Sequence, residues 1–383
     1  MSDIRAEWGL ADSSPPDRIA IFLPDLGGGG AERVMVTLAN EFLARGVAVD
    51  LVLVDKSGPY LSLVADGVRI IDLRARRMAR ALPPLVRYLR AERPKTLLSA
   101  LSHSNIVAVL AGRLARTSVR VVLSERVSYL AYEQFGHGFS NTIVQKLMKL
   151  LYPAADAVVT VAEAMIDELA SKVGVPRDRL FAIANPVVDD ELRIQALAEP
   201  SFWPPLPEGR RVVLGAGRLS PQKDFATLID AFDRVWPEVD AALVIIGEGP
   251  MRGELEALVA ARDLQDRVFL PGFLSPPFPL MRRADLFVLS SRFEGLPGTL
   301  IQAMACGTPV VSTDCPTGPS QILDGGKWGV LVPVGDVEAL ASAMTKSLLA
   351  SDHPDVVRRA EVFGVRQTTD AYLEVLLPRR RSS

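Results

Sequence analysis

Residues 285–306 read DLFVLSSRFEGLPGTLIQAMAC, and this stretch decides the fold. The apolar run at 285–290 predicts a buried parallel strand, and residues 300–306 predict a helix. Glu294 and a Gly-Leu-Pro-Gly loop lie between them. Doubly wound folds bind ligands where a strand passes into a helix, and helix N-termini attract phosphate. Gln302 lies about one turn inside the expected helix, so Glu294 and Gln302 could reach one ligand.

The rest of the chain alternates strand and helix patterns in two series. The first series has strand patterns at residues 18–24, 47–54, 96–100, 119–123 and 157–161. The second has them at 211–216, 241–246, 268–270, 285–290, 310–313 and 329–332. This alternation is typical of parallel sheets with βαβ connections. We therefore expect an α/β protein with two doubly wound, Rossmann-like domains that face each other across a cleft.

A proline-rich segment separates the two series. Residues 200–210 contain four prolines, which suit neither a helix interior nor a central strand. We expect a disordered N-terminus at 1–16, an N-terminal domain at 17–199, this linker and a second domain at 211–365. A C-terminal helix and basic tail at 366–383 would follow and could return to the N-terminal domain.

Length and composition exclude several classes of protein. The 383 residues are 49% hydrophobic, which is enough for two ordinary cores. Apolar runs such as 241–246 are far too short to span a bilayer, and no secretory signal is visible. The net charge of −2 disfavours general nucleic-acid binding. Cys306 and Cys315 make no disulfide framework, so we expect packed thiols in a reducing cytoplasm.

Basic residues are unevenly spread along the chain. Residues 69–95 carry nine Arg and Lys side chains, and the tail carries Arg379, Arg380 and Arg381. A basic segment with apolar residues between the charges can lie on an anionic membrane surface, and a solvated helix face is the equal alternative. The membrane hypothesis places the protein peripherally at the inner face of the cell membrane. It assigns the contact to Arg74, Arg76, Arg77 and Arg80.

A second polar loop opens the second domain. Residues 215–224 read GAGRLSPQKD and follow a strand at the start of a helix. Arg218 offers a planar fork for phosphate oxygens, and Lys223 offers a point charge. A departing diphosphate needs such cations because negative charge develops on it as its bond breaks. A turn with two surface cations is the alternative. However, the Glu294 loop emerges from the same expected sheet edge.

Several segments together resemble the family-4 retaining glycosyltransferases. In the second domain the resemblance covers nearly everything and is specific, resting on residues 217–224, 245–250, 293–297, 303–311, 314–319 and 329–333. In the first domain it is looser and rests on residues 27–32, 124–126 and 185–187. The resemblance implies the GT-B fold, with a nucleotide-sugar donor in the second domain and an acceptor mainly in the first. It also implies catalysis without a bound metal or other cofactor, and the scattered histidines His103, His137 and His353 fit this.

The resemblance further implies roles for single residues. Arg218 and Lys223 match the positions that hold the donor diphosphate. Glu294 matches the first acid of the family's E-x7-E motif, beside the donor sugar. The other residues expected to bind the donor are Gly217, Phe273, Gly295, Leu296, Pro297, Gly298, Thr299 and Gln302.

The chain departs from the family at two positions. Gln302 stands where a second Glu usually contacts the ribose hydroxyls, and Gln321 stands where Glu is frequent. Gln still accepts a hydrogen bond from a hydroxyl and can also donate one. The loss is a charge-assisted bond, so we expect weaker donor binding rather than loss of activity. An altered donor preference or a degenerate enzyme is the alternative.

The first domain contributes a glycine-rich loop at Gly27–Gly30 before a helix. Glycines allow close backbone approach, and a helix start favours phosphate, so Gly28, Gly29 and Gly30 are expected to shape the acceptor or phosphate site. A dinucleotide fingerprint is the rival interpretation, but its third glycine is absent. The candidate ribose acids Asp50 and Asp55 therefore have no supporting glycine pattern.

Two further polar residues follow strands of the first domain. His103 lies just after the strand at 96–100, where it could hydrogen-bond the donor sugar and join the catalytic set. A polar residue at a helix start is the equal alternative. Glu125 could bind acceptor hydroxyls, although a structural ion pair is slightly favoured.

These inferences predict sugar transfer from a nucleoside-diphosphate sugar, a UDP-sugar in the first instance, with retention at the anomeric carbon. The acceptor would be a glycan or lipid-linked sugar in polysaccharide or glycan assembly. The alternatives are a non-catalytic sugar-nucleotide-binding subunit and a sugar-nucleotide epimerase of the same fold. A phosphorylase would require a longer chain with a pyridoxal lysine.

Overall fold

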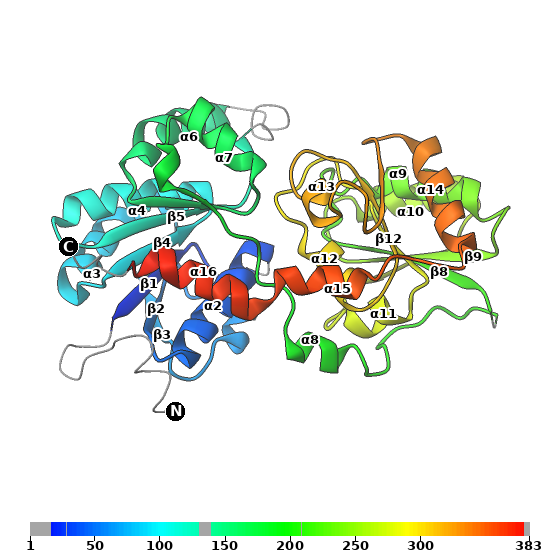
Figure 1. The fold of residues 1–383 in the computed structure, drawn as a ribbon, viewed down its shortest axis with the longest axis horizontal. Coiled ribbons are helices and arrows are strands. Elements are labelled where there is room, and N and C mark those ends of the chain that lie inside the picture. The colour runs from blue at the N-terminus through cyan, green and yellow to red at the C-terminus, as the bar shows by residue number, and fades with distance from the viewer. Residues whose placement is uncertain (1–16, 28, 130–138, 208, 379–383) are drawn as a thin grey trace. The chain divides into compact units, whose positions relative to one another are not determined.

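The protein consists of two α/β units, each built on a parallel sheet (Figure 1). A computed structural model describes residues 17–27, 29–129, 139–207 and 209–378. The first unit holds the described residues up to Pro186 and from Arg366 onward, and the second holds Val187–Val365. The predicted fold class, two doubly wound Rossmann-like domains, is confirmed.

The first unit contains a seven-stranded sheet in the order β3-β2-β1-β4-β5-β6-β7. The strands are β1 (Arg18–Leu23), β2 (Ala48–Leu53), β3 (Arg69–Asp72), β4 (Thr96–Ala100), β5 (Arg120–Glu125), β6 (Ala157–Thr160) and β7 (Leu180–Ala182). The edge strands β3 and β7 were not predicted from the sequence. β3 is short and has charged residues at both ends, and β7 has only three residues, so neither gives a distinct strand pattern.

Helices cover both faces of this first sheet. One face packs against α3 (Leu82–Glu92), α4 (Ser102–Ala115) and α6 (Phe139–Leu151). The other packs against α2 (Gly30–Ala44) and the C-terminal helix α16 (Val365–Leu376). Shorter elements are η1 (Pro59–Leu63), η2 (Met78–Arg80), η3 (Tyr152–Ala154), α7 (Ala164–Glu168), the π-helix η4 (Leu169–Val173) and η5 (Arg177–Arg179).

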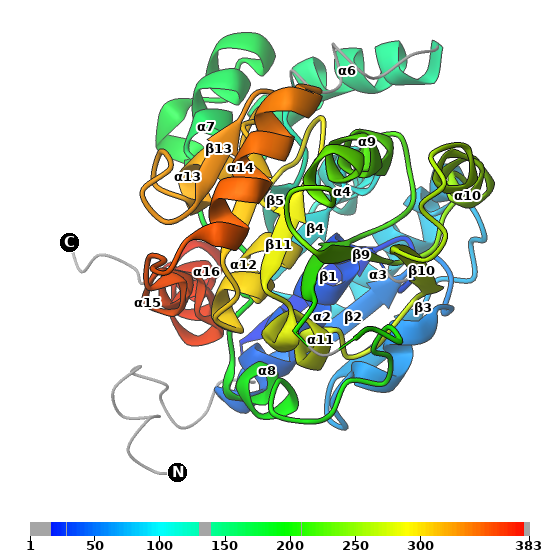
Figure 2. The ribbon, with the colours of Figure 1, turned by 90° about the vertical axis from the view of Figure 1, so that its right-hand side faces the viewer.

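The second unit contains a six-stranded sheet in the order β10-β9-β8-β11-β12-β13. The strands are β8 (Arg211–Ala216), β9 (Ala241–Ile246), β10 (Val268–Gly272), β11 (Leu286–Leu289), β12 (Val310–Thr313) and β13 (Val330–Val332). On one face α9 (Phe225–Val235) packs beside α14 (Val337–Leu349), with α10 (Arg252–Ala261) next to α9 (Figure 2). The remaining helices are α8 (Asp190–Gln195), α11 (Phe278–Arg283), α12 (Gly298–Ala305), α13 (Pro319–Ile322), α15 (Val356–Ala360) and η6 (Glu361–Phe363).

The boundary between the units differs from the one expected at residues 200–210. The backbone N–H groups of Val187 and Val188 donate to the carbonyl oxygen of Phe363, and that of Val365 donates to the carbonyl oxygen of Val188. These bonds tie residues 187–199 to the second unit, and the proline-rich segment lies within that unit as well. The chain therefore crosses between units at 186/187 and again at 365/366.

The C-terminal helix α16 belongs to the first unit. Thr96 Oγ1 donates to the carbonyl oxygen of Leu376 at 2.6 Å, and Arg120 Nε donates to that of Val375 at 3.0 Å. Tyr372 is fully buried. The expected disordered segment at 1–16 and the basic tail at 379–383 lie outside the described residues. Among the residues that are described, no helix is both long and apolar enough to cross a membrane.

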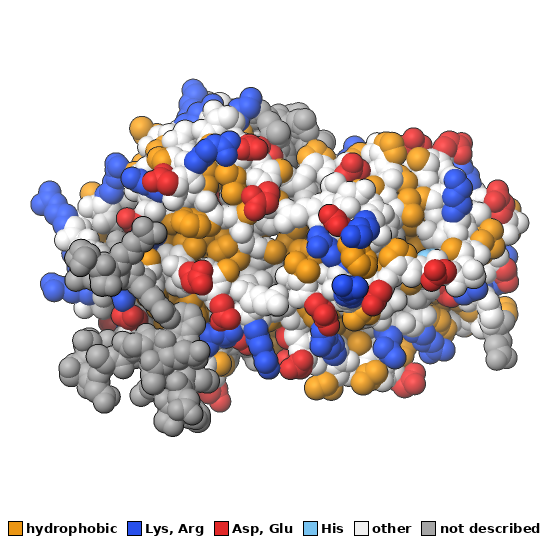
Figure 3. All heavy atoms as spheres, in the orientation of Figure 1, with side chains coloured by type: hydrophobic (Ala, Val, Ile, Leu, Met, Phe, Trp, Pro, Cys, Tyr) orange, Lys and Arg blue, Asp and Glu red, His pale blue; other side chains and the backbone are white. Residues whose placement is uncertain are grey.

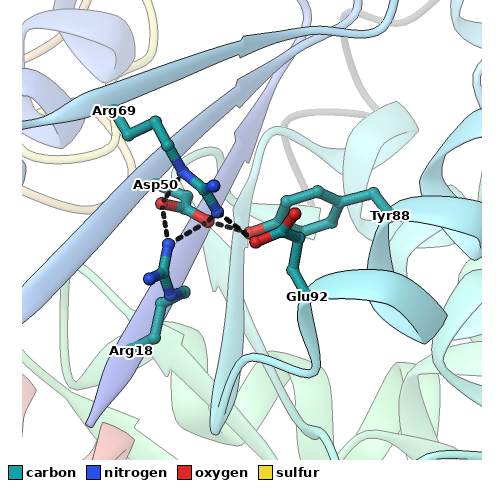
Figure 4. A network of polar contacts seen from close by, with 5 residues as sticks. All are labelled: Arg18, Asp50, Arg69, Tyr88 and Glu92. Atoms are coloured by element: carbon teal, nitrogen blue, oxygen red, sulfur yellow. Dashed lines mark hydrogen bonds and ion pairs between the residues drawn. The ribbon is translucent and has the colours of Figure 1, made fainter. Parts of the chain in front are cut away.

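A charged network joins three neighbouring strands of the first sheet (Figure 4). Asp50 on β2 is fully buried and accepts hydrogen bonds from Arg18 at 2.9 Å, Arg69 at 2.6 Å and the Tyr88 hydroxyl at 2.6 Å. Arg69 also pairs with Glu92 at 2.5 Å. Because these contacts occupy both carboxylate oxygens inside the sheet, Asp50 is not placed as a ribose ligand. Asp50 therefore no longer supports the interpretation of the first unit as a dinucleotide-binding domain.

The network also determines how Asp50 titrates. Burial alone would raise the pKa of Asp50, but hydrogen bonds from Arg69, Tyr88 and Arg18 outweigh burial and hold that pKa below its usual value. A lowered folded-state pKa contributes stability above the unfolded pKa, and that stability is lost as pH falls through the folded pKa. The contribution is therefore complete at neutral pH, begins to fall near about pH 4 and is lost once the pH lies below the folded-state pKa.

We predict that Asp50→Asn lowers the free energy of unfolding by about 2 to 3 kcal/mol at pH 7, because it removes the carboxylate that Arg18 and Arg69 share and leaves Arg69 with Glu92 alone. Denaturant unfolding followed by circular dichroism measures this change. The difference between variant and wild type should shrink as pH falls below about 4. Asp66→Ala, at an exposed position of the same unit, is the control and should leave stability unchanged. Equal stabilities of Asp50→Asn and wild type at pH 7 would contradict the prediction.

Candidate functional site

The strand order of the second unit creates a point where the chain direction across the sheet reverses. β8 lies between β9 and β11, so the connection after β8 runs to one side and the connection after β11 runs to the other. The loops at 217–224 and 290–297 leave the carboxyl ends of these neighbouring strands. Open α/β sheets bind their ligands at such a switch point. The residues predicted to bind the donor diphosphate and sugar gather here.

Lys223 and Glu294 form an ion pair across the switch point. Lys223 Nζ lies 2.5 Å from Glu294 Oε1, and their side chains are only 16% and 8% exposed. The buried Ser291 hydroxyl donates to the same oxygen at 2.6 Å. Thr317 Oγ1 donates to the backbone carbonyl oxygen of Glu294 at 2.5 Å. Glu294 is therefore held at both its backbone and its side chain, while Oε2 makes no hydrogen bond within the described part of the chain.

Further contacts join the two loops. Arg292 Nε lies 2.9 Å from Asp224 Oδ2, and the Arg292 backbone N–H donates to the carbonyl oxygen of Gln222 at 2.8 Å. Gln222 Nε2 donates to the carbonyl oxygen of Phe293 at 2.9 Å. Because these contacts link loops separated by about seventy residues of sequence, the switch point is a connected platform rather than two independent turns.

Close backbone contacts at the site require glycine. Gly247 has a φ of 139°, and a Cβ added there would overlap the carbonyl oxygen of Gly217. Gly318 has a φ of 85°, and its Cβ would overlap the carbonyl oxygen of Gly295. Both positions combine a backbone conformation that favours glycine with a contact that excludes any side chain. The loops after β8, β9, β11 and β12 are thus packed backbone to backbone.

Arg218 is the contrasting cation of the site. Its side chain is exposed, and it makes no ion pair or side-chain hydrogen bond with any described residue. Lys223, by comparison, already neutralises Glu294. Arg218 is therefore available to an anionic ligand without breaking an existing contact. Phe273 follows β10 and is 69% exposed, so its ring is also accessible.

The start of α12 lies beside this platform. Pro297 precedes the helix, and no side chain caps it. Thr299 Oγ1 is buried without a hydrogen-bond partner within the described residues. The first backbone N–H groups of a helix have no intrahelical partner, so an uncapped start suits an anion. Gln302 lies half-buried in the same helix, and Leu296 and Pro297 are buried before it.

The first unit has its own switch point between β1 and β4. The Gly27–Gly30 loop follows β1 and leads into α2, although Gly28 lies outside the described residues. The Glu32 carboxylate folds back on this loop, because a Cβ on Gly29 would overlap Glu32 Oε2. Burial raises the pKa of Glu32, although a hydrogen bond to its own backbone lowers it. Sequence reasoning did not single out Glu32, although it ends the resembling segment at 27–32 and is an acid in the first turn of a helix.

His103 and Glu125 lie near the same edge but in different environments. His103 is exposed in the first turn of α4. Glu125 is 1% exposed and accepts from the Tyr152 hydroxyl at 2.6 Å and from Ser102 Oγ at 3.2 Å. Burial raises the pKa of Glu125, although the hydrogen bond from Tyr152 lowers it.

The ion-pair interpretation of Glu125 does not match this arrangement. No ion pair to Glu125 occurs among the described residues, because its oxygens are occupied by hydroxyl groups instead. The carboxylate therefore holds the junction between β5 and α4. A contact with an acceptor would require it to leave these partners, and that contact stays a prediction.

Arg126 is a second residue that sequence reasoning did not single out. It is 8% exposed and donates to Asn185 Oδ1 at 2.5 Å and to the hydroxyl groups of Ser124 and Tyr372 at 3.3 Å. Burial lowers the pKa of Arg126. The motifs at 124–126 and 185–187 were the available signal, and the structure shows that they meet at this guanidinium. Within the described residues, no cluster of His, Cys, Asp and Glu is arranged to hold a metal ion.

Comparison with known proteins identifies both units. The family described as "Glycosyl transferases group 1" matches residues 210–350, and "Glycosyltransferase Family 4" matches residues 28–191. A Campylobacter jejuni relative is 26% identical over 88% of this chain and 91% of its own length. It is the N-acetylgalactosamine-N,N'-diacetylbacillosaminyl-diphospho-undecaprenol 4-alpha-N-acetylgalactosaminyltransferase. The amylovoran biosynthesis glycosyltransferase AmsD of Erwinia amylovora is 24% identical over 85% of this chain and 87% of its own length.

Solved structures share the fold at lower sequence identity. Anabaena HepE in complex with UDP and glucose superimposes with a TM-score of 0.76 at 18% identity, covering 94% of this chain and 99% of its own. The lipopolysaccharide outer core galactosyltransferase WaaB gives a TM-score of 0.70 at 18% identity, with the same coverage. At this level of identity the likeness establishes the two-unit architecture alone.

We predict a strong energetic coupling between Lys223 and Glu294. Lys223→Ala and Glu294→Ala should each lower the free energy of unfolding by about 3 kcal/mol, because each leaves a largely buried charge unpaired. The double variant should lose much less than the sum of the two. A double-mutant cycle measured by denaturant unfolding tests this. The exposed Asp167–Arg177 pair provides a control cycle whose coupling should be close to zero. Additive losses at Lys223 and Glu294 would contradict the prediction.

Proposed function

The chain belongs to the group 1, family 4 glycosyltransferases, and from this membership we propose that it transfers a sugar from a UDP-sugar to a glycan or lipid-linked acceptor. One observation carries the proposal for the donor. Arg218, which has no ion pair among the residues that the structure describes, lies on the loop that also positions the Lys223–Glu294 pair, beside an uncapped helix start. Two cations and a carboxylate at one switch point suit a ligand with a diphosphate and sugar hydroxyls.

The diphosphate would be bound by Arg218, Lys223 and the start of α12. The Arg218 guanidinium can form two parallel bonds to phosphate oxygens. Lys223 has three ammonium protons, so it can contact phosphate while it keeps its bond to Glu294. As the anomeric C–O bond breaks, negative charge moves onto the departing diphosphate, and these donors stabilise it. Positive charge at the leaving group thus comes from side chains, and we propose that the reaction needs no metal.

Glu294 would orient the donor sugar through Oε2. Its other oxygen already accepts from Lys223 and Ser291, so one carboxylate oxygen remains for hydroxyl groups. The same contacts make Glu294 a poor nucleophile, because its charge is neutralised by Lys223. This supports attack by the acceptor hydroxyl on the face that the diphosphate leaves, with retention at the anomeric carbon. The acceptor proton passes to the departing diphosphate oxygen.

The acceptor would be bound mainly by the first unit. The Gly27–Gly30 loop, His103 and the Glu32 carboxylate lie around its switch point, where hydroxyl and phosphate groups could be recognised. The Campylobacter relative is named for an undecaprenyl-diphosphate-linked substrate and the Erwinia relative for an exopolysaccharide pathway. These names favour lipid-linked glycan or polysaccharide assembly. Exposed Arg74, Arg76, Arg77 and Arg80 favour attachment to the inner face of the cell membrane.

A non-catalytic nucleotide-sugar-binding subunit is the second candidate. Near this site, only Gln302 favours such a subunit, because an amide stands where a carboxylate is expected. Such a subunit would bind UDP but would neither hydrolyse a UDP-sugar nor transfer its sugar. Turnover assays therefore separate the two candidates, and nuclear magnetic resonance of the product determines its anomeric configuration.

We predict that the purified protein releases UDP from a UDP-sugar when a lipid-linked acceptor is supplied, and that chelation of metal ions leaves the rate unchanged. Arg218→Gln should weaken UDP binding about 10- to 100-fold, because it removes charge-assisted bonds to phosphate. Calorimetric titration with UDP measures this. The free energy of unfolding should stay within about 0.5 kcal/mol, since the exposed Arg218 side chain makes no ion pair or side-chain hydrogen bond with any described residue.

Arg358→Gln is the matched control for Arg218→Gln. Arg358 is an exposed arginine of the same unit, on α15. The Arg358→Gln variant should bind UDP as the wild type does. Unchanged UDP binding in Arg218→Gln would remove the proposed diphosphate site. Tight UDP binding without turnover, across a screen of UDP-sugars and lipid-linked acceptors, would favour the binding subunit instead.

We predict that Gln302→Glu strengthens donor binding about five- to tenfold. The substitution restores a charged acceptor for hydroxyl groups, and charge-assisted hydrogen bonds are about twice as strong as neutral ones. The change should appear in the dissociation constant of UDP. Inorganic pyrophosphate, which has no ribose, is the control ligand and should bind equally to both proteins. An equal or weaker affinity for UDP would show that Gln302 does not contact the nucleoside.

A further inference from the structure

The helix α6 of the first unit carries large apolar side chains on its exposed surface as well as in the core. Val144, Met148 and Leu151 face inward and are buried in the core of that unit. On the outward side, Leu150 is 71% exposed and Ile143 is 41% exposed. A surface helix of a globular protein normally presents polar residues to water. Two large aliphatic side chains seven residues apart share one outward stripe, and they remain uncovered within the described chain.

Lysines flank these aliphatic side chains. Lys146 and Lys149 are exposed on the same helix, and the sequence of α6 contains no acidic residue. Lys149 also lies 5.7 Å from the centre of the Tyr129 ring. In Figure 3, Lys and Arg side chains line the margin of the first unit near α6. A mixture of exposed leucine, isoleucine and lysine without acids is typical of helices that lie in the plane of a membrane interface.

The neighbouring helices continue the same charge pattern. α3, α4 and α6 pack on one face of the sheet, with α4 in contact with both others. Their outward sides carry the exposed Arg87, Arg113, Arg116 and the 51% exposed Leu114. Between residues 73 and 124 the chain has eleven Lys and Arg residues and one acid. That acid, Glu92, is already paired with Arg69. This helical layer is therefore strongly basic although the whole chain is close to neutral.

We propose that the outward side of α6, continued by the end of α4, docks on an anionic lipid bilayer, with Ile143 and Leu150 inserted between the headgroups. Lys146, Lys149 and Arg113 contact the lipid phosphates. This deepens the membrane attachment proposed above, which rested on the Arg74–Arg80 segment alone, by adding an apolar anchor. Basic groups are attracted within a Debye length of the surface, whereas buried apolar side chains hold the protein there.

A bilayer suits this face better than a second copy of the chain. A two-fold interface would place the same basic helices against each other, and like charges repel. Anionic headgroups complement the lysines and arginines, and the acyl region accommodates the aliphatic side chains. A bilayer would thus contact both the basic and the aliphatic side chains of this face.

The first experiment measures binding to vesicles of phosphatidylcholine with about one third phosphatidylglycerol, by flotation. Wild type should float with these vesicles. Leu150→Ser should reduce the partition coefficient about tenfold, at low salt and at about 1 M salt alike, because the lost contribution is apolar. Lys146→Gln combined with Lys149→Gln should reduce it about twentyfold at low salt and little at high salt.

The second unit supplies a matched control. Leu349 on α14 is 68% exposed, close to the 71% of Leu150, and Lys346 is exposed on the same helix. Leu349→Ser and Lys346→Gln should leave vesicle binding unchanged. All these positions are at the surface, so circular dichroism and denaturant unfolding should match wild type. An effect of Leu349→Ser equal to that of Leu150→Ser would overturn the assignment to α6.

A labelled cysteine reports insertion directly. The two native cysteines, Cys306 and Cys315, are buried, so a thiol introduced by Leu150→Cys is labelled selectively. An environment-sensitive fluorophore at this position should shift to the blue on addition of the anionic vesicles. The same fluorophore introduced through Leu349→Cys should not shift. An unshifted label at position 150 while the protein is bound would overturn the insertion.

The outcomes separate docking from catalysis. Vesicle binding without any UDP release would overturn sugar transfer and leave the docking face intact. Transfer to a soluble acceptor by a protein that does not bind anionic vesicles would overturn the docking. A change of sedimentation in Leu150→Ser without a change in vesicle binding would instead identify the face as an interface between copies of the chain, and would also overturn the proposal.

Discussion

The second unit depends on the ion pair between Lys223 and Glu294. The strand order brings the loops after β8 and β11 together at one sheet edge, where each contributes a charge that is largely removed from water. Either charge alone would be costly to bury, and the two neutralise each other at 2.5 Å. The pair therefore positions both loops before any ligand is present. Preorganisation of this kind is what stabilisation of a developing charge requires, since donors that are already oriented need no rearrangement during the reaction.

The first unit has the same kind of switch point but holds it differently. Glu125 is surrounded by hydroxyl donors, and Arg126 by neutral acceptors, so hydrogen bonds replace the ion pair. Glu32 occupies the region where a helix start would otherwise attract phosphate. An anionic diphosphate would consequently suit the second unit better, because Arg218 makes no ion pair or side-chain hydrogen bond with any described residue and Lys223 keeps ammonium protons beyond its bond to Glu294. A hydroxyl-rich sugar is better matched to the first unit, where carboxylates and hydroxyl groups dominate.

Most of the architecture could be predicted from the sequence because buried parallel strands leave long apolar runs, as at 241–246 and 285–290. The edge strand β3 was not predicted, because Arg69 and Asp72 lie at the margin of the sheet and interrupt such a run. The unit boundary was misplaced because prolines at 200–210 indicate an irregular segment without revealing which unit it packs on. Arg218 and Glu294 lie in local motifs, so the sequence could single them out as candidates, and the structure brings Lys223 to Glu294. Arg126 acts through contacts with Asn185 and Tyr372 in distant segments, which no local pattern reveals. Ser291 bonds to Glu294 within one loop, but a serine in a loop gives no signal of its own.

The uneven distribution of charge along the chain bears on how the protein approaches a charged surface. A net charge of −2 conceals a basic helical layer in the first unit, because acids elsewhere in the chain balance it. An uneven distribution orients a protein as it approaches a charged surface, over distances of about a Debye length, even when its total charge is small. Orientation by charge alone is lost as salt rises, whereas the exposed Ile143 and Leu150 make a contact that salt does not screen. In the proposed docking the two kinds of contact would therefore be complementary: the basic layer would select an anionic surface and its orientation, and α6 would determine how long the protein stays there.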